Sequence, residues 1–232
     1  MQDLQPKLDQ ITSNTRRLVQ PERLAVSEQA TADLFSTGIE EQILPVGAEA
    51  PAFALEDAST GKTVNSADLL AIGPLVLNFF RGRWCPYCIT ELEAWRDLYP
   101  ELRRSGVVFA AISPQNRRHN SFTAEHLLKN APHRLAFPIL SDPEATLAGQ
   151  FGIAYTIPNL GRAYFRSILV NIPLANSGSS YDTAPDSAWR LPLPATFVIR
   201  QNSTIAFAEA HADFRVRPEP SGILAALAEL RR

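Results

Sequence analysis

Cys85 and Cys88 are the only cysteines in the chain and are separated by two residues. They follow the apolar run 75–80 and precede apolar residues at three- and four-residue spacing, which predicts a helix over 86–104. With Cys85 at the N-cap, Pro86 falls at the first helical position, where its missing N–H costs nothing. The sulfur of Cys85 then faces unpaired backbone N–H groups and the positive end of the helix dipole, which favours the thiolate. Because Cys88 lies one turn on, it can close a disulfide when Cys85 is oxidised, and the spacing predicts dithiol redox chemistry.

Other uses of the two cysteines are disfavoured by the same sequence. A zinc site needs about four ligands, and the four histidines stand singly, away from the cysteines. Two buried structural thiols are the stronger alternative, since a free cysteine packs like a small hydrophobe. A structural disulfide would close a very short loop and constrain the unfolded chain little. The coincidence of strand, proline, helix and both cysteines favours reactive thiols, with no metal and no other cofactor.

The composition is that of an ordinary globular protein: the 232 residues are 45% apolar and 20% charged, with a net charge of −2. This length fits one large domain or a domain with an appendage. The small net charge disfavours nucleic acid or an anionic membrane as the main partner. No apolar run approaches the roughly twenty residues of a membrane span, and the N-terminus shows no secretory-signal pattern. With both cysteines in a reactive motif, the expected location is the reducing cytoplasm.

Residues 1–44 are expected to form a helical N-terminal extension. An apolar stripe at helical spacing precedes Pro21, which opens a second helical stretch that ends near Gly38. Two amphipathic helices cannot bury their apolar faces alone. They are therefore expected to pack either on the main domain or on a second subunit, and the second alternative would make a homodimer.

Residues 45–232 alternate strand and helix patterns, which predicts an α/β fold with a central mixed sheet flanked by helices. An insertion at about 154–190 interrupts this pattern, and long insertions in compact domains are usually functional or act as lids. Its aromatic residues, which are Tyr155, Tyr164, Phe165, Tyr181 and Trp189, either shield the cysteines and shape a pocket or pack the insertion onto the sheet. The second interpretation is favoured. The expected strands are 52–55, 74–80, 107–112, 137–140, 195–199 and 204–208, and the further helices are 117–130, 144–151, 162–169 and 223–230.

Three segments carry a resemblance to a known family. Residues 84–88, Trp-Cys-Pro-Tyr-Cys, resemble the thioredoxin active-site turn, with the Pro-Tyr dipeptide seen in glutaredoxins. Residues 137–143 resemble the strand and turn that peroxiredoxins carry after their third helix, and residues 193–199 resemble the superfamily's cis-proline strand. The chain thus resembles the thioredoxin superfamily and, over about residues 46–230, its peroxiredoxin-like AhpC/TSA branch.

This resemblance implies a thioredoxin-like fold and a redox-active disulfide between two catalytic residues, Cys85 and Cys88. The residues expected to support them are Trp84, Pro86, Arg81, Pro194 and Thr196. A cis Leu193–Pro194 bond facing the cysteines would leave the chain there open as a docking edge for a substrate's backbone. The resemblance also implies an external thiol reductant, of the thioredoxin or glutathione type, and a small peroxide or disulfide as substrate.

The chain departs from the peroxiredoxin pattern Pro-x-x-x-Thr-x-x-Cys, whose hydroxyl acts with a distant arginine to bind and activate the peroxide. No Thr or Ser stands three residues before either cysteine, and Leu193-Pro194 occupy the place of the family's arginine. The candidates to replace that arginine are Arg81, Arg83 and Arg190. Asn78 stands about where thioredoxins bury a carboxylate that moves protons for the second cysteine. We therefore expect slow reduction of hydrogen peroxide beside that of ordinary peroxiredoxins.

The favoured function is a peroxiredoxin-like antioxidant oxidoreductase in which Cys85 attacks and Cys88 resolves. The electrophile is either a hydroperoxide O–O bond or a disulfide S–S bond. The overall resemblance narrowly favours the peroxide, whereas the missing hydroxyl and arginine favour disulfide exchange. The reverse assignment, with Cys88 as the peroxidatic residue, stays open. An alternative from another class is a redox-sensing interaction protein with little turnover.

Overall fold

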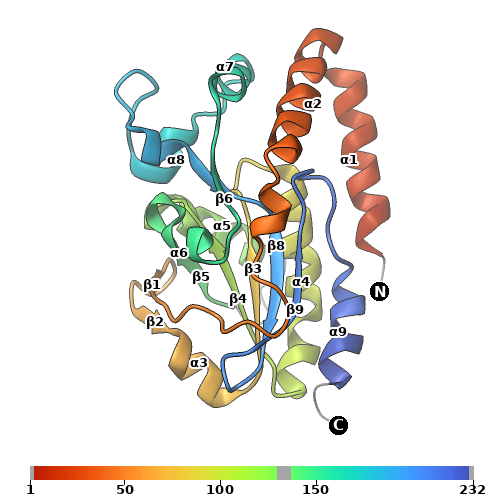
Figure 1. The fold of residues 1–232 in the computed structure, drawn as a ribbon, viewed down its shortest axis with the longest axis vertical. Helices are drawn as coiled ribbons and strands as arrows, with labels where there is room; N and C mark the ends of the chain where they lie inside the picture. Colours follow the sequence, from red (N-terminus) through yellow and green to blue (C-terminus); the bar gives the residue numbers. More distant parts are fainter. Residues whose placement is uncertain (1–2, 130–136, 230–232) are drawn as a thin grey trace.

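A seven-stranded mixed sheet forms the centre of the computed structural model, which describes residues 3–129 and 137–229 (Figure 1). In spatial order its strands are β2 (Thr63–Asn65), β1 (Ala54–Asp57), β5 (Ile139–Ser141), β4 (Val108–Ser113), β3 (Leu75–Phe79), β8 (Ala195–Ile199) and β9 (Ile205–Ala210). The central strands β5, β4 and β3 are parallel, and every other pairing is antiparallel. A second sheet pairs β6 (Ala154–Thr156) with β7 (Arg190–Pro192). The predicted mixed α/β sheet is confirmed.

Helices cover both faces of the large sheet (Figure 1). The α-helices are α1 (Leu4–Leu18), α2 (Pro21–Ser36), α3 (Ser66–Ile72), α4 (Pro86–Arg104), α5 (Arg117–Lys129), α6 (Thr146–Gln150), α7 (Asn159–Ser167), α8 (Ile172–Ser177) and α9 (Pro220–Glu229). The 3-10 helices are η1 (Ile39–Gln42), η2 (Pro143–Ala145) and η3 (Asp186–Trp189). Helix α4 has the bounds that the sequence predicts. Residues 130 and 230, expected at the ends of two helices, lie outside the described residues.

Strand β3 shows how the sheet separates two apolar clusters. All five of its residues are buried, and its side chains alternate between the two faces. Leu77 and Phe79 belong to the cluster under α3 and α6, whereas Val76 belongs to the cluster under α4. Asn78 lies on the α4 face, because its amide bonds to a side chain of that helix. The alternation therefore places one polar group of β3 directly beneath the helix that carries the cysteines.

The N-terminal helical pair, α1 and α2, packs on the rest of its own chain (Figure 1). Leu4 and Leu8 are buried in the cluster beneath α4. The carboxylate of Glu219 accepts hydrogen bonds from the backbone N–H groups of Leu4 and Gln5 at 2.9 and 2.7 Å. An anion at the N-terminus of α1 accepts hydrogen bonds from backbone N–H groups that have no partner within the helix, and it interacts favourably with the helix dipole. The expected helical extension is confirmed, and a homodimer through it stays a prediction.

The inserted segment has more regular structure than its sequence indicates. Strand β6 and strand β7 close it at its base, and α7 replaces the expected helix at 162–169. A further short helix, α8, follows α7 within the insertion. Its aromatic core contains Phe165 and Trp189. The insertion is therefore a small packed unit, and α2 lies against α7.

The expectation of a cis peptide bond before Pro194 is wrong, since the Leu193–Pro194 bond is trans. Proline lowers the cost of the cis form, but trans remains favoured by about 0.5–1 kcal/mol unless the fold requires otherwise. Here the chain continues from β7 into β8, and Pro194 is buried between them. The docking edge inferred from the cis bond is withdrawn with it.

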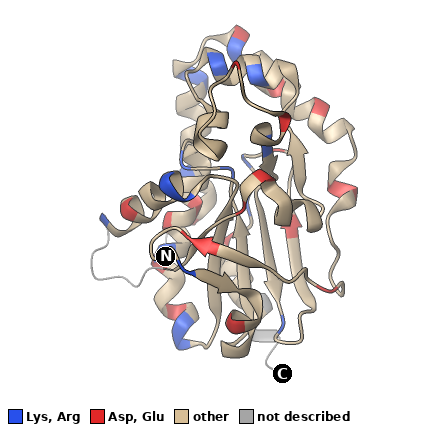
Figure 2. Ribbon diagram, turned by 90° about the vertical axis from the view of Figure 1, so that its left-hand side faces the viewer, with Lys and Arg blue, Asp and Glu red and all other residues tan. Residues whose placement is uncertain are grey.

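Charged residues lie mostly on the helices and connecting segments, with both signs intermixed (Figure 2). In the part of the chain that the structure describes, no helix is both long enough and apolar enough to cross a bilayer.

Candidate active site

The turn between β3 and α4 carries Cys85 to the N-terminus of the helix. Gly82 in this turn adopts φ +145°, a conformation that L side chains rarely adopt. A Cβ there would also lie 2.6 Å from Nε1 of Trp84. The buried side chain of Gln115 accepts a hydrogen bond from the N–H of Arg83 at 2.7 Å. The conformation of Gly82 and the hydrogen bond to Gln115 thus fix the path of the turn, and Cys85 becomes the N-cap residue of α4, as predicted.

The two thiols are buried and differently tuned. Cys85 is 2% exposed and Cys88 is fully buried, and both are free. Burial opposes ionisation, yet a hydrogen bond from Cys88 and the charges of Arg81 and Arg217 lower the pKa of Cys85 to about 6. Burial, the hydrogen bond to Cys85 and the Cys85 charge raise the pKa of Cys88 well above its ordinary value. Cys85 is therefore the thiolate near neutral pH, and Cys88 is the thiol.

A buried polar network lies against Cys88. Arg217 Nη2 lies 3.4 Å from Cys88 Sγ, and Arg217 Nε donates to Glu91 Oε2 at 2.7 Å. Asn78 Nδ2 donates to Glu91 Oε1 at 2.7 Å and to Thr196 Oγ1 at 3.2 Å. Burial raises the pKa of Glu91 to about 7, although the charge of Arg217 acts in the opposite direction. The network places a cation beside Cys88 and a carboxyl that titrates near neutral pH behind it.

Arg81 supplies a second buried cation, on the side of Cys85. Its side chain is enclosed by aromatic rings, with the guanidinium carbon 4.4 Å from the ring centroid of Phe214 and 4.9 Å from that of Trp84. Such contacts hold a guanidinium without neutralising it. Within the described residues, Nε of Arg81 is buried and has no hydrogen-bond partner. Arg81 therefore keeps an unused donor next to the thiolate.

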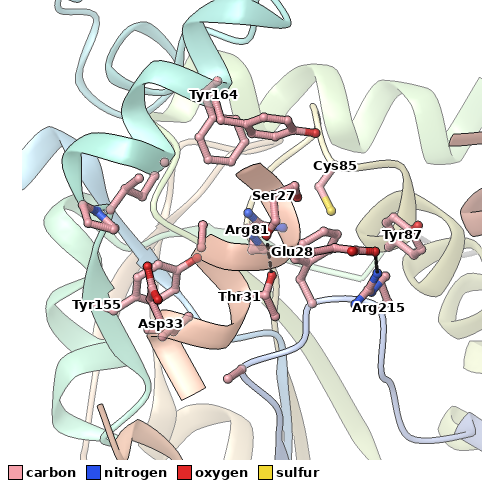
Figure 3. A pocket seen from close by; sticks show the side chains of 18 of the residues that line it. Ser27, Glu28, Thr31, Asp33, Arg81, Cys85, Tyr87, Tyr155, Tyr164 and Arg215 are labelled. Carbon is pink, nitrogen blue, oxygen red and sulfur yellow. Dashed lines mark hydrogen bonds and ion pairs between the residues drawn. The ribbon is translucent and has the colours of Figure 1, made fainter. Parts of the chain in front are cut away.

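A pocket of about 650 Å³ lies over the Cys85 turn (Figure 3). Its walls are mostly apolar and come from α1, α2, α7, β6 and residues 212–215. Figure 3 shows Cys85 and Arg81 gathered with Ser27 and Thr31, which point inward from α2. A volume of this size suits a small organic molecule. Cys85 and Arg81 thus both belong to the lining of one pocket.

Most of the predicted supporting residues lie at this site. Trp84 and Pro86 line the pocket. Thr196 is remote from the pocket lining but joins the network behind Cys88 through its hydrogen bond with Asn78. Pro194 is buried between two strands and is absent from the lining formed by the described residues. The structure therefore gives Pro194 no direct contact with a molecule in the pocket.

The three arginines considered as peroxide-binding groups differ in their position relative to the pocket. Arg81 lines the pocket, whereas Arg83 is exposed on the turn. Arg190 points toward Gly149, on the far side of the insertion's base. Neither Arg83 nor Arg190 contributes to the pocket lining among the described residues. Of these three, Arg81 is the one that shares the pocket lining with Cys85.

The aromatic residues of the insertion divide between the two interpretations that the sequence allowed. Tyr155, Tyr164 and Phe165 line the pocket, and Phe165 meets Trp84 edge-on with ring centroids 5.1 Å apart. Trp189 and Tyr181 instead pack within the insertion. The insertion thus both has its own core and forms one wall of the site.

Glu91 and Arg217 are the site residues that the sequence reasoning missed. Glu91 lies on the apolar face of α4, three residues after Cys88, and a charged residue in an apolar stripe is a signal that sequence alone provides. Arg217 lies 129 residues from Cys88 along the chain. No spacing rule joins residues so far apart, so only the fold reveals their contact.

Comparisons with known proteins agree with this geometry. Over 116 residues, or 49% of the chain, it is 28% identical to the thiol-disulfide oxidoreductase ResA of Bacillus anthracis, and the match covers 61% of that protein. Over 122 residues, or 52% of the chain, it is 29% identical to a Coxiella burnetii protein provisionally named peroxiredoxin bcp, and covers 75% of it. The chain thus matches less than two thirds of the ResA length.

The fold is shared with solved peroxiredoxin structures. Peroxidoxin BcpB from Mycobacterium tuberculosis superposes with a TM-score of 0.58 at 24% identity, covering 82% of this chain and 99% of that one. A yeast mitochondrial 1-Cys peroxiredoxin superposes with a TM-score of 0.59 at 18% identity, over 82% and 77%. The model of the AhpC/TSA family matches residues 46–208, which is well over half of the chain. The chain therefore belongs to the AhpC/TSA family, as its resemblance implies.

Proposed function

We propose that this member of the AhpC/TSA family is a thiol-dependent peroxidase that cycles between a Cys85–Cys88 dithiol and the corresponding disulfide. The observation that carries the proposal is the opposite tuning of two adjacent buried thiols, with the pKa of Cys85 near 6 and that of Cys88 raised. The thiolate is the nucleophilic form, so Cys85 attacks the substrate and Cys88 then reacts with the oxidised Cys85. An external thiol must then reduce the disulfide, in a reducing compartment such as the cytoplasm.

The proposed chemistry has two steps. The Cys85 thiolate attacks one oxygen of the hydroperoxide, the O–O bond breaks, and the leaving alkoxide or hydroxide takes up a proton as Cys85 becomes a sulfenic acid. The sulfur of Cys88 then attacks the sulfur of Cys85. The sulfenic hydroxyl leaves as water with the proton of Cys88, and the disulfide forms.

Two arginines have distinct parts in these steps. Arg81 lines the pocket together with Cys85, so its guanidinium can bind the oxygen on which negative charge develops, the task of the hydroxyl that this chain lacks. Arg217 Nη2, 3.4 Å from Cys88 Sγ, stabilises negative charge on Cys88 as it loses its proton. Because Glu91 already holds Nε of Arg217, the cation stays directed at the sulfur.

Disulfide exchange is the second candidate. Its support is the 28% identity to a thiol-disulfide oxidoreductase over 116 residues, 49% of the chain. The same pair of thiols would serve, with Cys85 attacking a substrate disulfide and Cys88 releasing the product. The burial of Cys85 under α2 limits this alternative to small disulfides.

The two candidates separate in a stopped-flow experiment on the reduced protein. Trp84 adjoins Cys85, so its fluorescence reports oxidation of the pair. We expect hydrogen peroxide and cumene hydroperoxide to oxidise the protein faster than oxidised glutathione does, and Cys85→Ser to abolish the response. Faster oxidation by the disulfide would favour exchange. A negligible rate with all three would favour a redox-sensing role.

A further inference from the structure

The burial of Cys85 restricts what can reduce the disulfide as well as what can form it. A thiol that reduces a disulfide must bring its own sulfur into contact with one of the two disulfide sulfurs. Cys88 is fully buried and Cys85 is 2% exposed. Among the residues that the structure describes, the pocket whose lining includes Cys85 is the route by which a thiol can approach.

The N-terminal helical pair covers this approach and is fixed at its contacts with the rim. The hydroxyl groups of Thr12 on α1 and Tyr87 on α4 lie 3.0 Å apart. On α2, Glu28 lies 3.8 Å from Nη1 of Arg215. Arg23 donates to the carbonyl of Ser167 on α7 at 3.1 Å. The pair thus contacts three segments around the pocket. Because α1 is also anchored by its buried residues, the pair is a fixed part of the fold that covers the pocket.

Beneath this cover, the pocket still has room for a small molecule. Its volume of about 650 Å³ lies within the roughly 300–1,000 Å³ range of ligand sites. A protein dithiol presents its sulfur on a folded surface, and that surface cannot pass between α2 and α7, which are in contact. Size alone therefore separates small thiols from protein thiols.

The charge at the base of the pocket favours the ionised form of an entering thiol. In the reduced protein, Tyr155 and then the Cys85 thiolate are the groups whose charges act most strongly on the buried Arg81 guanidinium. Disulfide formation removes that thiolate and leaves the cation without it. A buried cation without a partner is costly, so the binding of an entering thiolate beside Arg81 is favoured.

From these observations we infer that a low-molecular-weight thiol, bound under α2 with its sulfur beside Arg81, reduces the Cys85–Cys88 disulfide, and that the N-terminal helical pair excludes protein reductants. The inference rests on the proposed disulfide cycle. The thiolate attacks Cys85 Sγ, the S–S bond breaks, and Cys88 leaves as a thiolate beside Arg217 before it takes up a proton. A second small thiolate attacks the small-molecule sulfur of the mixed disulfide, which releases the symmetrical disulfide and the Cys85 thiolate. Two electrons pass from two small thiols to the protein.

The test starts from full-length protein oxidised with diamide, so its outcome does not depend on whether a peroxide or a disulfide is the natural oxidant. Reduced glutathione, 2-mercaptoethanol and reduced thioredoxin are each mixed with it, and free cysteines are alkylated and counted by mass spectrometry over time. We expect thioredoxin to be no faster, per mole, than glutathione. A thioredoxin rate a hundredfold above that of glutathione would overturn the inference.

A variant of α2 tests the route of entry. Thr31→Trp places a large side chain in the pocket beside Cys85, and we expect at least tenfold slower reduction by glutathione. Ala25→Trp is the matched control, because Ala25 is exposed on the same helix and outside the lining, and its rate should equal that of the wild type. Equal rates for both variants would overturn the inference. If Thr31→Trp lowers the thermal unfolding temperature, Ser27→Phe replaces it as the variant that fills the pocket. The comparison of thioredoxin with glutathione on wild-type protein tests the inference independently of any variant.

Discussion

Replacing Arg81 with glutamine tests whether a single buried cation both ionises Cys85 and activates the substrate. Arg81 is 5% exposed, and its charge is among the causes that bring the pKa of Cys85 to about 6 against the effect of burial. An opposite charge nearby typically lowers a pKa by about 1–3 units, so its loss should raise the pKa of Cys85 by a similar amount. At about 1.4 kcal/mol per unit, the thiolate becomes less stable by roughly 1.4–4 kcal/mol.

The peroxide reaction of the variant should stay slower even above the new pKa, where both proteins carry the thiolate. The variant also lacks the guanidinium as a donor to the substrate, and loss of one such donor costs about 2.7–4 kcal/mol, or two to three orders of magnitude in rate. Two measurements separate these contributions: the pH dependence of Cys85 alkylation by iodoacetamide, and stopped-flow oxidation by hydroperoxide at a pH above both pKa values.

Arg83→Gln is the matched control, because Arg83 lies in the same turn but is exposed. It should leave the alkylation midpoint and the peroxide rate unchanged. Arg81→Lys, which keeps the charge and loses the planar fork, should keep a low alkylation midpoint and lose part of the peroxide rate. If Arg81→Gln folds normally by circular dichroism yet keeps a midpoint near 6 and the wild-type rate, the role assigned to Arg81 is refuted.

Three further predictions concern the surroundings of the thiols. The pKa of Glu91 in the folded protein is about 7, above its ordinary 4.5. Its contribution of about 3 kcal/mol to the free energy of unfolding is therefore complete below pH 4.5 and lost as the pH rises through 7. Urea unfolding across this range should show the loss in the wild type and not in Glu91→Gln. Gly82→Ala should lower the free energy of unfolding by about 1–3 kcal/mol in urea, because position 82 has a positive φ and a close neighbour. Gly222→Ala, in a helix with open space around it, should be neutral or stabilising. Equal effects of the two substitutions would contradict the requirement for glycine at position 82. Leu8→Ala should lower the free energy of unfolding by about 2–5 kcal/mol in the same assay, against about 0.5 kcal/mol or less for Leu18→Ala at an exposed position. A small loss of stability in Leu8→Ala would mean that α1 is not part of the fold.

The elements nearest the cysteines were predictable because their signals are local. Apolar periodicity and Pro86 at the first helical position define α4, and the continuous apolar run defines β3 as a buried strand. The N-cap position of Cys85 follows from these two elements alone. The side of the sheet on which Asn78 lies follows from the strand's alternation once α4 is placed.

What the sequence did not predict depends on contacts between distant segments. The ion pair between Glu91 and Arg217 joins positions 126 residues apart, and it exists because the segment before α9 returns to α4. The short strands β6 and β7 have three residues each, too few for a periodic pattern to show. The trans bond before Pro194 was mispredicted because a family pattern, and no property of the local sequence, indicated cis.

The most direct test of the account is to find which cysteine becomes the sulfenic acid. Reduced Cys88→Ser and Cys85→Ser proteins are each treated with one equivalent of hydroperoxide in the presence of dimedone, and the adducts are located by mass spectrometry. The account predicts an adduct on Cys85 in Cys88→Ser, none in Cys85→Ser, and an intramolecular disulfide without adduct in the wild type. An adduct on Cys88 in Cys85→Ser, formed as fast as that on Cys85, would contradict it.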